Sequence, residues 1–218
     1  MTHIVWDWNG TLLHDIDAVI TATNASFAEF GFEPLTLERY RDLYVVPVPR
    51  FYERIMGRLP TEEEWEVMDE TFHRHYWAAA ADAGLADGVD RLLGDWQRQG
   101  LSQSLLSLAP HDRLVPLVRT FGIEGRFLRV DGRTGPSHTT KAGHLVRHLE
   151  ALAPTGVTAA RTVLIGDALD DAAAAAHVGA RAVLYTGGSH SRTSLEAAGV
   201  PVVDTLEEAV RTARDLAG

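Results

Sequence analysis

An aspartate and a glycine near the start of the chain have the types and spacing to present a nucleophile. Asp7 follows the apolar run His3–Trp6, and Gly10 comes three residues later in the order Asp7-Trp8-Asn9-Gly10-Thr11. A buried strand that ends in a carboxylate and a glycine turn places that carboxylate at a sheet edge, because glycine tolerates the tight backbone. A carboxylate presented in this way is suited to covalent catalysis. We therefore expect Asp7 to act as a nucleophile.

Three further polar positions fall where an apolar run ends or a helical pattern begins. Ser107 follows the run Leu101–Leu106, and we favour it over Ser102 and Ser104 because it alone ends that run. Lys141 begins a helical pattern and is the one lysine among the 20 basic residues. Its ammonium is a compact point charge that the planar guanidinium of arginine does not reproduce. The third position is the acidic segment Gly-Asp-Ala-Leu-Asp-Asp, residues 166–171.

The elements that must position these side chains alternate between strand and helix from Gly88 onward. Short apolar strands separated by helices indicate a parallel sheet covered on both faces, a doubly wound α/β fold with ligands beyond the carboxyl ends of the strands. We predict strands at 3–8, 101–106, 127–130, 162–165, 182–185 and 200–203. We predict helices at 89–98, 113–121, 142–152, 171–178, 191–198 and 206–216.

A helical block interrupts this alternation between the first strand and the rest. Helix-like apolar spacing covers 16–32, 37–44, 51–56 and a long segment from Thr61, where Thr61-Glu62-Glu63-Glu64 forms a capping box. We predict a core domain made of residues 1–15 and 85–218, with an all-helical cap domain of residues 16–84 inserted into it.

Composition limits the surroundings of the protein. The 218 residues carry a net charge of −10, include no cysteine, and contain no apolar stretch long enough to span a bilayer. The negative charge disfavours nucleic acid and anionic membranes as partners, and the N-terminus has no secretory leader pattern. We expect a cytoplasmic protein; the sequence leaves the oligomeric state open.

The order of these motifs resembles the four signatures of the haloacid dehalogenase (HAD) superfamily of phosphotransferases. The resemblance lies in Asp-x-x-Gly-Thr-Leu at the start, then Ser107, Lys141 and Gly-Asp-x-x-x-Asp before an alanine-rich helix. It implies that Asp7 forms an aspartyl-phosphate, with Ser107 and Lys141 assisting. It also implies Mg2+ bound by Asp7, the carbonyl of Asn9, Asp167 and Asp171, with Asp170 as the alternative to Asp171.

The same resemblance implies which residues meet the substrate, a small phosphorylated metabolite. Gly10 and Thr11 lie at the phosphoryl group. In the phosphoglycolate-phosphatase-like branch a cap loop selects the substrate, and here the loop 45–50 places Arg50 where it could pair with a substrate anion.

Asn9 departs from the HAD phosphatases, which carry an acid–base aspartate two residues after the nucleophile. An amide cannot transfer a proton, and general acid–base catalysis contributes roughly 10²- to 10⁴-fold. Other relatives that lack this aspartate do not fit. The chain has no cap lysine for a phosphonatase, it keeps Gly166-Asp167 unlike the dehalogenases, and it has no membrane spans for an ion pump.

Three hypotheses follow from Asn9. The enzyme hydrolyses substrates whose leaving group needs no proton, such as acyl or aryl phosphates. Alternatively, another side chain replaces the aspartate, the candidates being His14, Asp15, His73 and His75. The third hypothesis is a slow or inactive module that binds phosphate and metal as a sensor or regulator. We favour an active Mg2+-dependent phosphatase.

Overall fold

A six-stranded parallel sheet forms the centre of the computed structural model, which describes residues 2–136 and 139–217. The strand order is β5-β4-β1-β6-β7-β8, so the first strand of the chain lies in the middle. The bounds are β1 His3–Trp6, β4 Ser102–Pro110, β5 Val130–Arg133, β6 Thr162–Gly166, β7 Arg181–Tyr185 and β8 Val202–Val203. In register, Trp6 of β1 pairs with Leu105 on one side and Ile165 on the other. This arrangement confirms the predicted α/β fold class.

Helices cover both faces of the sheet because successive strand residues point to opposite sides. Ile4 and Trp6 pack with α5 (Val89–Arg98), α6 (His111–Thr120) and α10 (Leu206–Ala217). Val5, between them, packs on the other face with α7 (Lys141–Leu152), α8 (Leu169–Val178) and α9 (Arg192–Glu196). Short 3₁₀ turns lie at η1 Ala80–Asp82, η2 Glu124–Arg126, η3 Ala153–Thr155 and η4 Ala159–Arg161.

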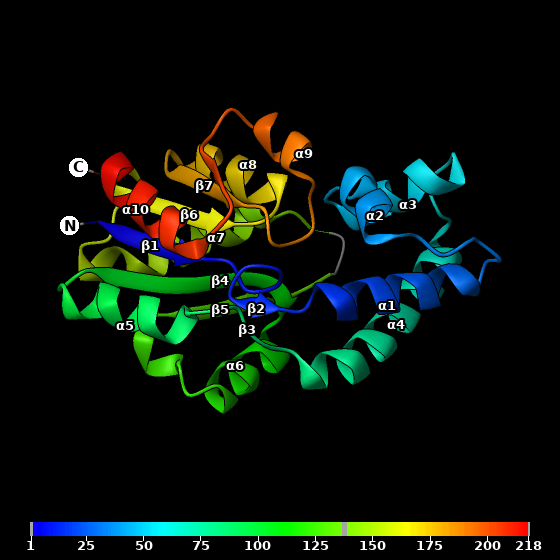
Figure 1. Ribbon diagram of the computed structural model, residues 1–218, viewed down its shortest axis with the longest axis horizontal. Coiled ribbons are helices and arrows are strands. Elements are labelled where there is room, and N and C mark those ends of the chain that lie inside the picture. Colours follow the sequence, from blue (N-terminus) through cyan, green and yellow to red (C-terminus); the bar gives the residue numbers. More distant parts are fainter. Residues whose placement is uncertain (1, 137–138, 218) are drawn as a thin grey trace.

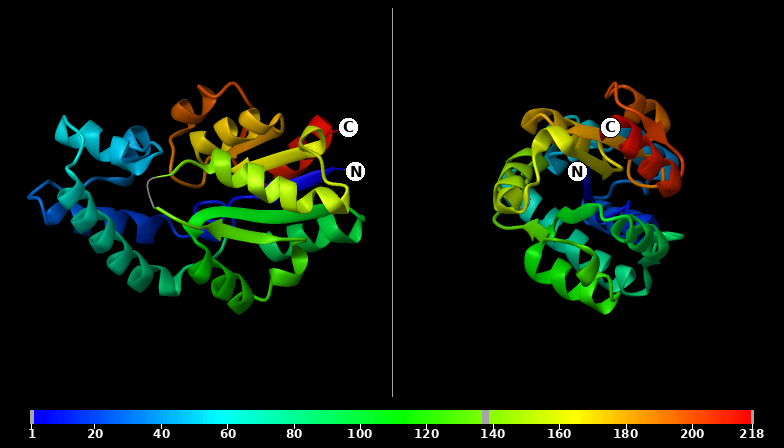
Figure 2. Two further views of the ribbon diagram at one scale, coloured as in Figure 1. Left: turned by 180° about the vertical axis from the view of Figure 1, so that it is seen from behind. Right: turned by 90° about the vertical axis from the view of Figure 1, so that its left-hand side faces the viewer.

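Four helices between β1 and α5 form a separate block beyond the carboxyl ends of the strands (Figures 1 and 2). They are α1 Ile16–Ala28, α2 Leu37–Leu43, α3 Val48–Met56 and α4 Glu62–Ala79, and α4 begins with the capping box of Thr61 and Glu64. The block has its own core, which includes Phe27, Phe51 and Met68. Two short antiparallel strands join it to the sheet, β2 Leu13–His14 and β3 Gly84–Leu85. None of the helices in the described residues is long and apolar enough to cross a membrane.

The structure corrects three predicted strand bounds and adds one pair of strands. Strand β1, expected at 3–8, ends at Trp6. The strand expected at 127–130 is wrong: β5 begins at Val130, and Phe127 ends the 3₁₀ turn η2 while Leu128 is 53% exposed. As an edge strand, β5 does not need the continuous apolar run that the prediction relied on. Strand β4 does not end before Ser107 but continues to Pro110, with a register shift after Leu106. The β2–β3 pair was not predicted, since two-residue strands have no visible period.

A chain of buried hydrogen bonds ties the centre of the sheet to helix α7. The Oγ of Ser104 on β4 lies 2.8 Å from His3 Nε2 on β1 and 2.8 Å from His148 Nε2 on α7. His148 Nδ1 in turn lies 2.7 Å from Asp131 Oδ2 on β5. Although burial opposes it, these bonds and Arg129 hold the pKa of Asp131 down at about 2. Ser104 is therefore part of the scaffold and not of the site.

Two buried histidines predict loss of stability in mild acid. Burial, and for His3 also the charge of His148, lowers the pKa values of His3 and His190 from 6.5 to about 4. As the pH falls below 6.5, these histidines are protonated in the unfolded chain but stay neutral in the folded chain, so their contribution to stability decreases until about pH 4. We expect a loss of about 3 kcal/mol per histidine at most over this window, measured by urea unfolding at a series of pH values. The raised pKa values of Asp7, Asp15 and Asp167 act in the opposite direction, so the histidine contribution is read as the difference between the unaltered chain and His3→Gln. An equal pH dependence of unfolding in both chains from pH 6.5 to 4 contradicts this account.

Candidate active site

The carboxyl ends of three adjacent strands bring Asp7, Ser107 and Asp167 to one edge of the sheet. Asp7 directly follows β1, and its backbone N–H donates to Ile165 O of β6 at 2.9 Å. Asp167 directly follows β6, and Ser107 lies on β4 beyond the last regular pair with β1. All three side chains are buried and line one cavity. The strand order thus converts positions that are far apart in sequence into one cluster.

Lys141 bridges two carboxylates of this cluster. Its Nζ donates to Asp7 Oδ1 at 2.6 Å and also to Asp171 Oδ1, and all three groups are buried. Burial alone lowers the pKa of a lysine, but Asp171 and Asp7 hold the pKa of Lys141 above its ordinary value. Lys141 therefore remains a cation. Burial raises the pKa of Asp7, with the Lys141 charge acting against it and the charges of Asp171 and Asp167 adding to it.

Three buried carboxylates face this one ammonium. Asp7, Asp167 and Asp171 each offer an oxygen, and these atoms lie within 4.8 Å of one another. Burial and the charge of Asp171 raise the pKa of Asp167 to about 6. The donors are hard oxygens and the cluster holds more negative charge than Lys141 can balance, so it suits a divalent cation such as Mg2+.

Two glycines make room for the carboxylates. Gly10 has φ of +67°, and a Cβ there would lie 2.7 Å from Asp167 Oδ2. A Cβ on Gly166 would lie 2.2 Å from Asp171 Oδ2. Thr11 is buried and its hydroxyl lies 3.4 Å from Asp167 Oδ1, so its side chain is directed to this carboxylate instead of to the cavity.

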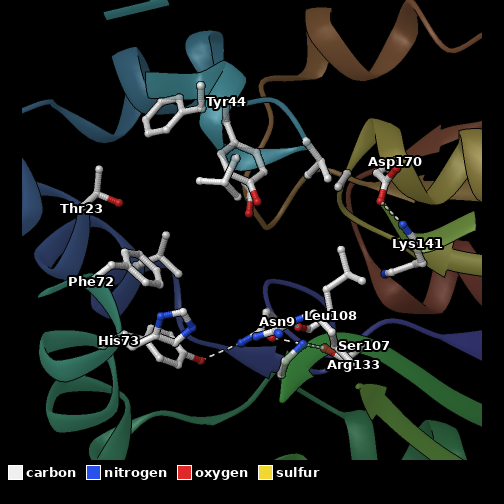
Figure 3. A pocket seen from close by; sticks show the side chains of 18 of the residues that line it. Asn9, Thr23, Tyr44, Phe72, His73, Ser107, Leu108, Arg133, Lys141 and Asp170 are labelled. Carbon is white, nitrogen blue, oxygen red and sulfur yellow. Dashed lines mark hydrogen bonds between the residues drawn. The ribbon is translucent and has the colours of Figure 1, made fainter. Parts of the chain in front are cut away.

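The structure separates the two neighbouring aspartates that the sequence left as alternatives. Asp171 points into the acidic cluster, whereas Asp170 Oδ2 accepts the backbone N–H of Lys141 at 2.7 Å (Figure 3). Asp170 therefore caps helix α7 and positions the lysine. Asp171 also accepts the backbone N–H of Ala168 through Oδ2, which fixes its carboxylate at the start of α8.

The amide of Asn9 is held by a carboxylate and a phenol. Asn9 Nδ2 donates to Asp15 Oδ2 at 2.7 Å and to Tyr76 Oη at 2.6 Å, and Tyr76 Oη donates to Asp15 Oδ2 at 2.7 Å. Asp15 Oδ1 accepts the backbone N–H of Gly10 at 2.7 Å. Burial raises the pKa of Asp15, while the bonds from Asn9, Tyr76 and Gly10 oppose that rise. Because Nδ2 is held in this way, Asn9 Oδ1 turns toward Ser107 Oγ, 3.4 Å away (Figure 3).

A cavity of about 210 Å³ lies between the sheet edge and the helical block. Its core side carries Asp7, Asn9, Ser107, Lys141 and Asp167. Its other side is formed by residues of α1–α4 and the loop before α3, including Tyr44, Phe51, Phe72 and Tyr76 (Figure 3).

Arg50 is not brought to this site. It lies outside the cavity lining, its side chain is 55% exposed, and its guanidinium pairs with Glu53 at 2.7 Å. The reason is helical direction: α3 starts at Val48, so Phe51 and Tyr52 face inward and Arg50 faces solvent. The sequence analysis missed Arg133 at the end of β5, which lines the cavity beside Ser107 and whose Nε donates to Leu108 O at 3.0 Å. Arg133 was not predicted because the strand that carries it was expected at 127–130, before this residue.

The four candidates for replacing the acid–base aspartate lie in different places. His14 and His75 are exposed and do not line the cavity. His73 lines it, with Nδ1 donating to Asp69 O at 2.8 Å. Asp15 is buried behind Asn9, away from the cavity lining.

Comparison with known families accounts for this arrangement. Residues 1–179 match the family model described as haloacid dehalogenase-like hydrolase. The chain belongs to the haloacid dehalogenase-like hydrolases. This confirms the resemblance inferred from the four motifs, and it makes the protein a member of a hydrolase family.

Relatives of this HAD-like hydrolase share most of its length. A phosphoglycolate phosphatase of Cereibacter sphaeroides is 27% identical over 193 residues, which cover 86% of each chain. Phosphoglycolate phosphatase 1 of Pseudomonas aeruginosa is 26% identical, covering 94% of this chain and 77% of its own. The crystal structure of a hydrolase from Pseudomonas syringae superposes with a TM-score of 0.81 at 18% identity and covers 100% of both chains.

Removing the phenol that holds Asn9 is expected to destabilise the protein. In Tyr76→Phe, the Nδ2 donor of Asn9 and the carboxylate of Asp15 each lose a buried hydrogen-bond partner. We expect the free energy of unfolding to fall by about 1–3 kcal/mol. Tyr44→Phe is the matched control, since the Tyr44 hydroxyl lines the same cavity and no bond from it to another described residue is present. Urea unfolding of both variants measures the difference. Equal stabilities of Tyr76→Phe and Tyr44→Phe show that the Asn9 contacts are energetically neutral.

Proposed function

We propose that the protein is a Mg2+-dependent phosphatase of a small phosphorylated compound, with Asp7 as the nucleophile. One observation carries this proposal: Lys141 Nζ bridges Asp7 and Asp171 at the floor of a cavity. An ammonium in this place neutralises both the attacking carboxylate and an incoming phosphoryl anion. The names of the two bacterial relatives, both phosphoglycolate phosphatases, support the reaction class.

The first step forms a covalent bond between Asp7 and phosphorus. A carboxylate oxygen of Asp7 attacks, the bond from phosphorus to the ester oxygen breaks, and the leaving group departs with that electron pair. Lys141 holds Asp7 in place. The Ser107 hydroxyl, which accepts the backbone N–H of Ala109 at 3.0 Å, can rotate its proton to a phosphoryl oxygen. In the second step water attacks the aspartyl-phosphate, inorganic phosphate leaves, and the Asp7 carboxylate is restored.

The acidic cluster fits the metal that this chemistry needs. Asp7, Asp167, Asp171 and the backbone carbonyl of Asn9 would hold Mg2+. When bound, Mg2+ supplies positive charge that offsets the phosphoryl oxygens and fixes the in-line geometry.

We further propose that residues 16–84 act as a cap that closes over the substrate and excludes water. Arg41 of α2 supports this role because its Nε donates to Gly188 O at 2.8 Å and its Nη2 to Gly187 O at 3.2 Å. Tyr44, one turn on, packs edge-on against His190 of the same core loop. These contacts tie the helical block to the core above the acidic cluster.

Activity is expected to depend on Asp171 much more than on Asp170. Asp171→Asn removes a charge that contacts Lys141 and would contact Mg2+, so we expect a fall in kcat/KM of about 100-fold or more and weaker Mg2+ binding. Asp170→Asn keeps an oxygen that accepts the Lys141 backbone N–H and should lose much less. Hydrolysis of phosphate esters and acyl phosphates, with Mg2+ titrations by calorimetry, compares the two. Mg2+ affinity equal to that of the unaltered chain in Asp171→Asn contradicts the proposed metal site.

The hydrogen bond between Asn9 and Asp15 predicts that a single variant at Asn9 behaves differently from a double variant at both positions. Asn9→Asp alone sets two carboxylates against each other where a 2.7 Å hydrogen bond now lies, and should destabilise the fold. Combining it with Asp15→Asn restores one amide and one carboxylate, and places the carboxylate at the cavity. We expect the double variant to hydrolyse alkyl phosphates roughly 10²-fold faster than the unaltered chain.

The same comparison tests the alternative of a sensor that binds phosphate and metal without turnover. Phosphate and Mg2+ binding without hydrolysis of any ester or acyl phosphate, followed by activity in the double variant, establishes the sensor and removes the claim of native activity.

A further inference from the structure

The wall of the cavity opposite Asp7 is mainly aromatic. Phe72 and Tyr76 of α4 stack with their rings 7° from parallel and centroids 5.7 Å apart. Tyr44 and Phe51 meet edge-on with centroids 5.8 Å apart. These side chains and Val48 line the cavity on the side of the helical block; Tyr44 and Phe72 are labelled in Figure 3. Aromatic rings bind best between such walls, by offset stacking and edge-to-face contacts.

The charges along the cavity disfavour a second anion on the substrate. Among the described lining residues, α1–α4 and the loop before α3 contribute no lysine or arginine, because Arg50 faces solvent. They do contribute the acidic Asp69, whose carboxylate lies 3.5 Å from His73 Nδ1. The two cationic lining residues, Lys141 and Arg133, both lie on the core side. Positive charge is thus available to the phosphoryl group and absent where a carboxylate tail would lie.

The size of the cavity fits one ring. A cavity of about 150 Å³ accommodates benzene, and this one is about 210 Å³. The space therefore suits a single aromatic ring that carries a phosphoryl group.

Asn9 points to the same class of substrate through the leaving group. The amide cannot protonate a departing oxygen, and the Tyr76 proton is engaged by Asp15. The Nδ1 proton of His73, the histidine in the cavity lining, is engaged by Asp69 O. An alkoxide is about as basic as hydroxide, whereas a phenoxide is far less basic, since the pKa of a phenol is near 10. A phenoxide can therefore depart without proton transfer.

From these features we infer that the substrate is a phosphate monoester of a single aromatic ring without a carboxylate tail, an inference that rests on the proposed phosphatase function. Asp7 attacks phosphorus, the bond to the aryl oxygen breaks, and the aryloxide leaves with the electron pair and takes a proton from water after release. Water then cleaves the aspartyl-phosphate to phosphate.

Binding of non-hydrolysable phosphonates tests the cavity separately from reactivity. Benzylphosphonate and 3-phosphonopropionate are the probes, measured by calorimetry with Mg2+ present. We expect benzylphosphonate to bind at least about tenfold more tightly, as stacking on the ring walls predicts. Equal binding, or tighter binding of the carboxylated probe, overturns the inference.

A cation placed on the wall should reverse this preference. Phe72→Arg puts a guanidinium in the cavity and should shift the ratio of the two affinities toward 3-phosphonopropionate by about tenfold or more. Val67→Arg is the matched control on the same helix, because Val67 is 45% exposed and does not line the cavity. If Phe72→Arg does not fold, Phe72→Leu keeps an apolar side chain without the ring and should weaken only benzylphosphonate. An unchanged affinity ratio in Phe72→Leu counts against ring recognition.

Turnover separates this inference from the proposed function. We expect kcat/KM for phenyl phosphate to exceed that for glycerol phosphate and phosphoglycolate, and to rise steeply as substituents make the phenol more acidic. Faster hydrolysis of phosphoglycolate, or of acetyl phosphate with phenyl phosphate inert, leaves the phosphatase in place and overturns the aryl substrate. If none of these compounds is hydrolysed, both the proposed phosphatase function and the aryl substrate are overturned.

Discussion

The bridge from Lys141 to Asp7 and Asp171 is the interaction on which the rest of the site depends. Three carboxylates buried within a few ångströms of each other would repel strongly, and removing charges from water is costly unless they are paired. The ammonium of Lys141 lies between Asp7 and Asp171 and reduces this repulsion. The cluster still carries more negative charge than the one ammonium balances, which suits a metal ion. The surrounding structure serves this bridge: Asp170 fixes the backbone of Lys141, and Gly166 admits Asp171. A lysine suits this place because its ammonium is a compact point charge that contacts both carboxylates, whereas a guanidinium is planar and larger.

Asn9 forms a hydrogen-bonded pair with Asp15, so its role is more than the absence of an acid–base aspartate. Its amide donates to Asp15, which also accepts from Gly10 and Tyr76, so a carboxylate lies directly behind Asn9, on the side away from the cavity. The charge of this region is therefore kept, but it lies on the far side of the amide from the cavity. This arrangement also links the helical block to the core, since Tyr76 belongs to α4. Asn9, beside Asp7 in the core, is thus in direct contact with the helical block.

In the inferred reaction, the aromatic wall and the amide of Asn9 restrict the substrate in two independent ways. The wall restricts its shape, and the amide restricts the basicity of its leaving group. The relatives named phosphoglycolate phosphatase share the reaction class of the proposed function, and they differ from this chain over most positions, at 26–27% identity. Identity at that level is compatible with one set of residues at the sheet edge and a different lining in the cap. In the proposed function, the residues at the strand ends carry out the reaction and the helical block selects the substrate.

The sequence by itself determined the α/β class, the alternation of elements and the residues at the strand ends. These follow from local rules, since apolar period and glycine position report which backbone a segment adopts and where it stops. Even the lone lysine could be singled out by type. Prediction failed where local pattern is weak: β5 is a polar edge strand, and β2 and β3 are too short to show a period.

Only the tertiary structure decided which side chains meet. It separated Asp171 from Asp170, turned Arg50 to solvent, brought Arg133 to the cavity and joined Asn9 to Tyr76, 67 residues away. Each outcome depends on the rotation of a helix or the register of a strand relative to distant elements. A difference of one residue reverses the direction of a side chain, and such a difference is invisible in a pattern whose boundaries are uncertain by one or two positions.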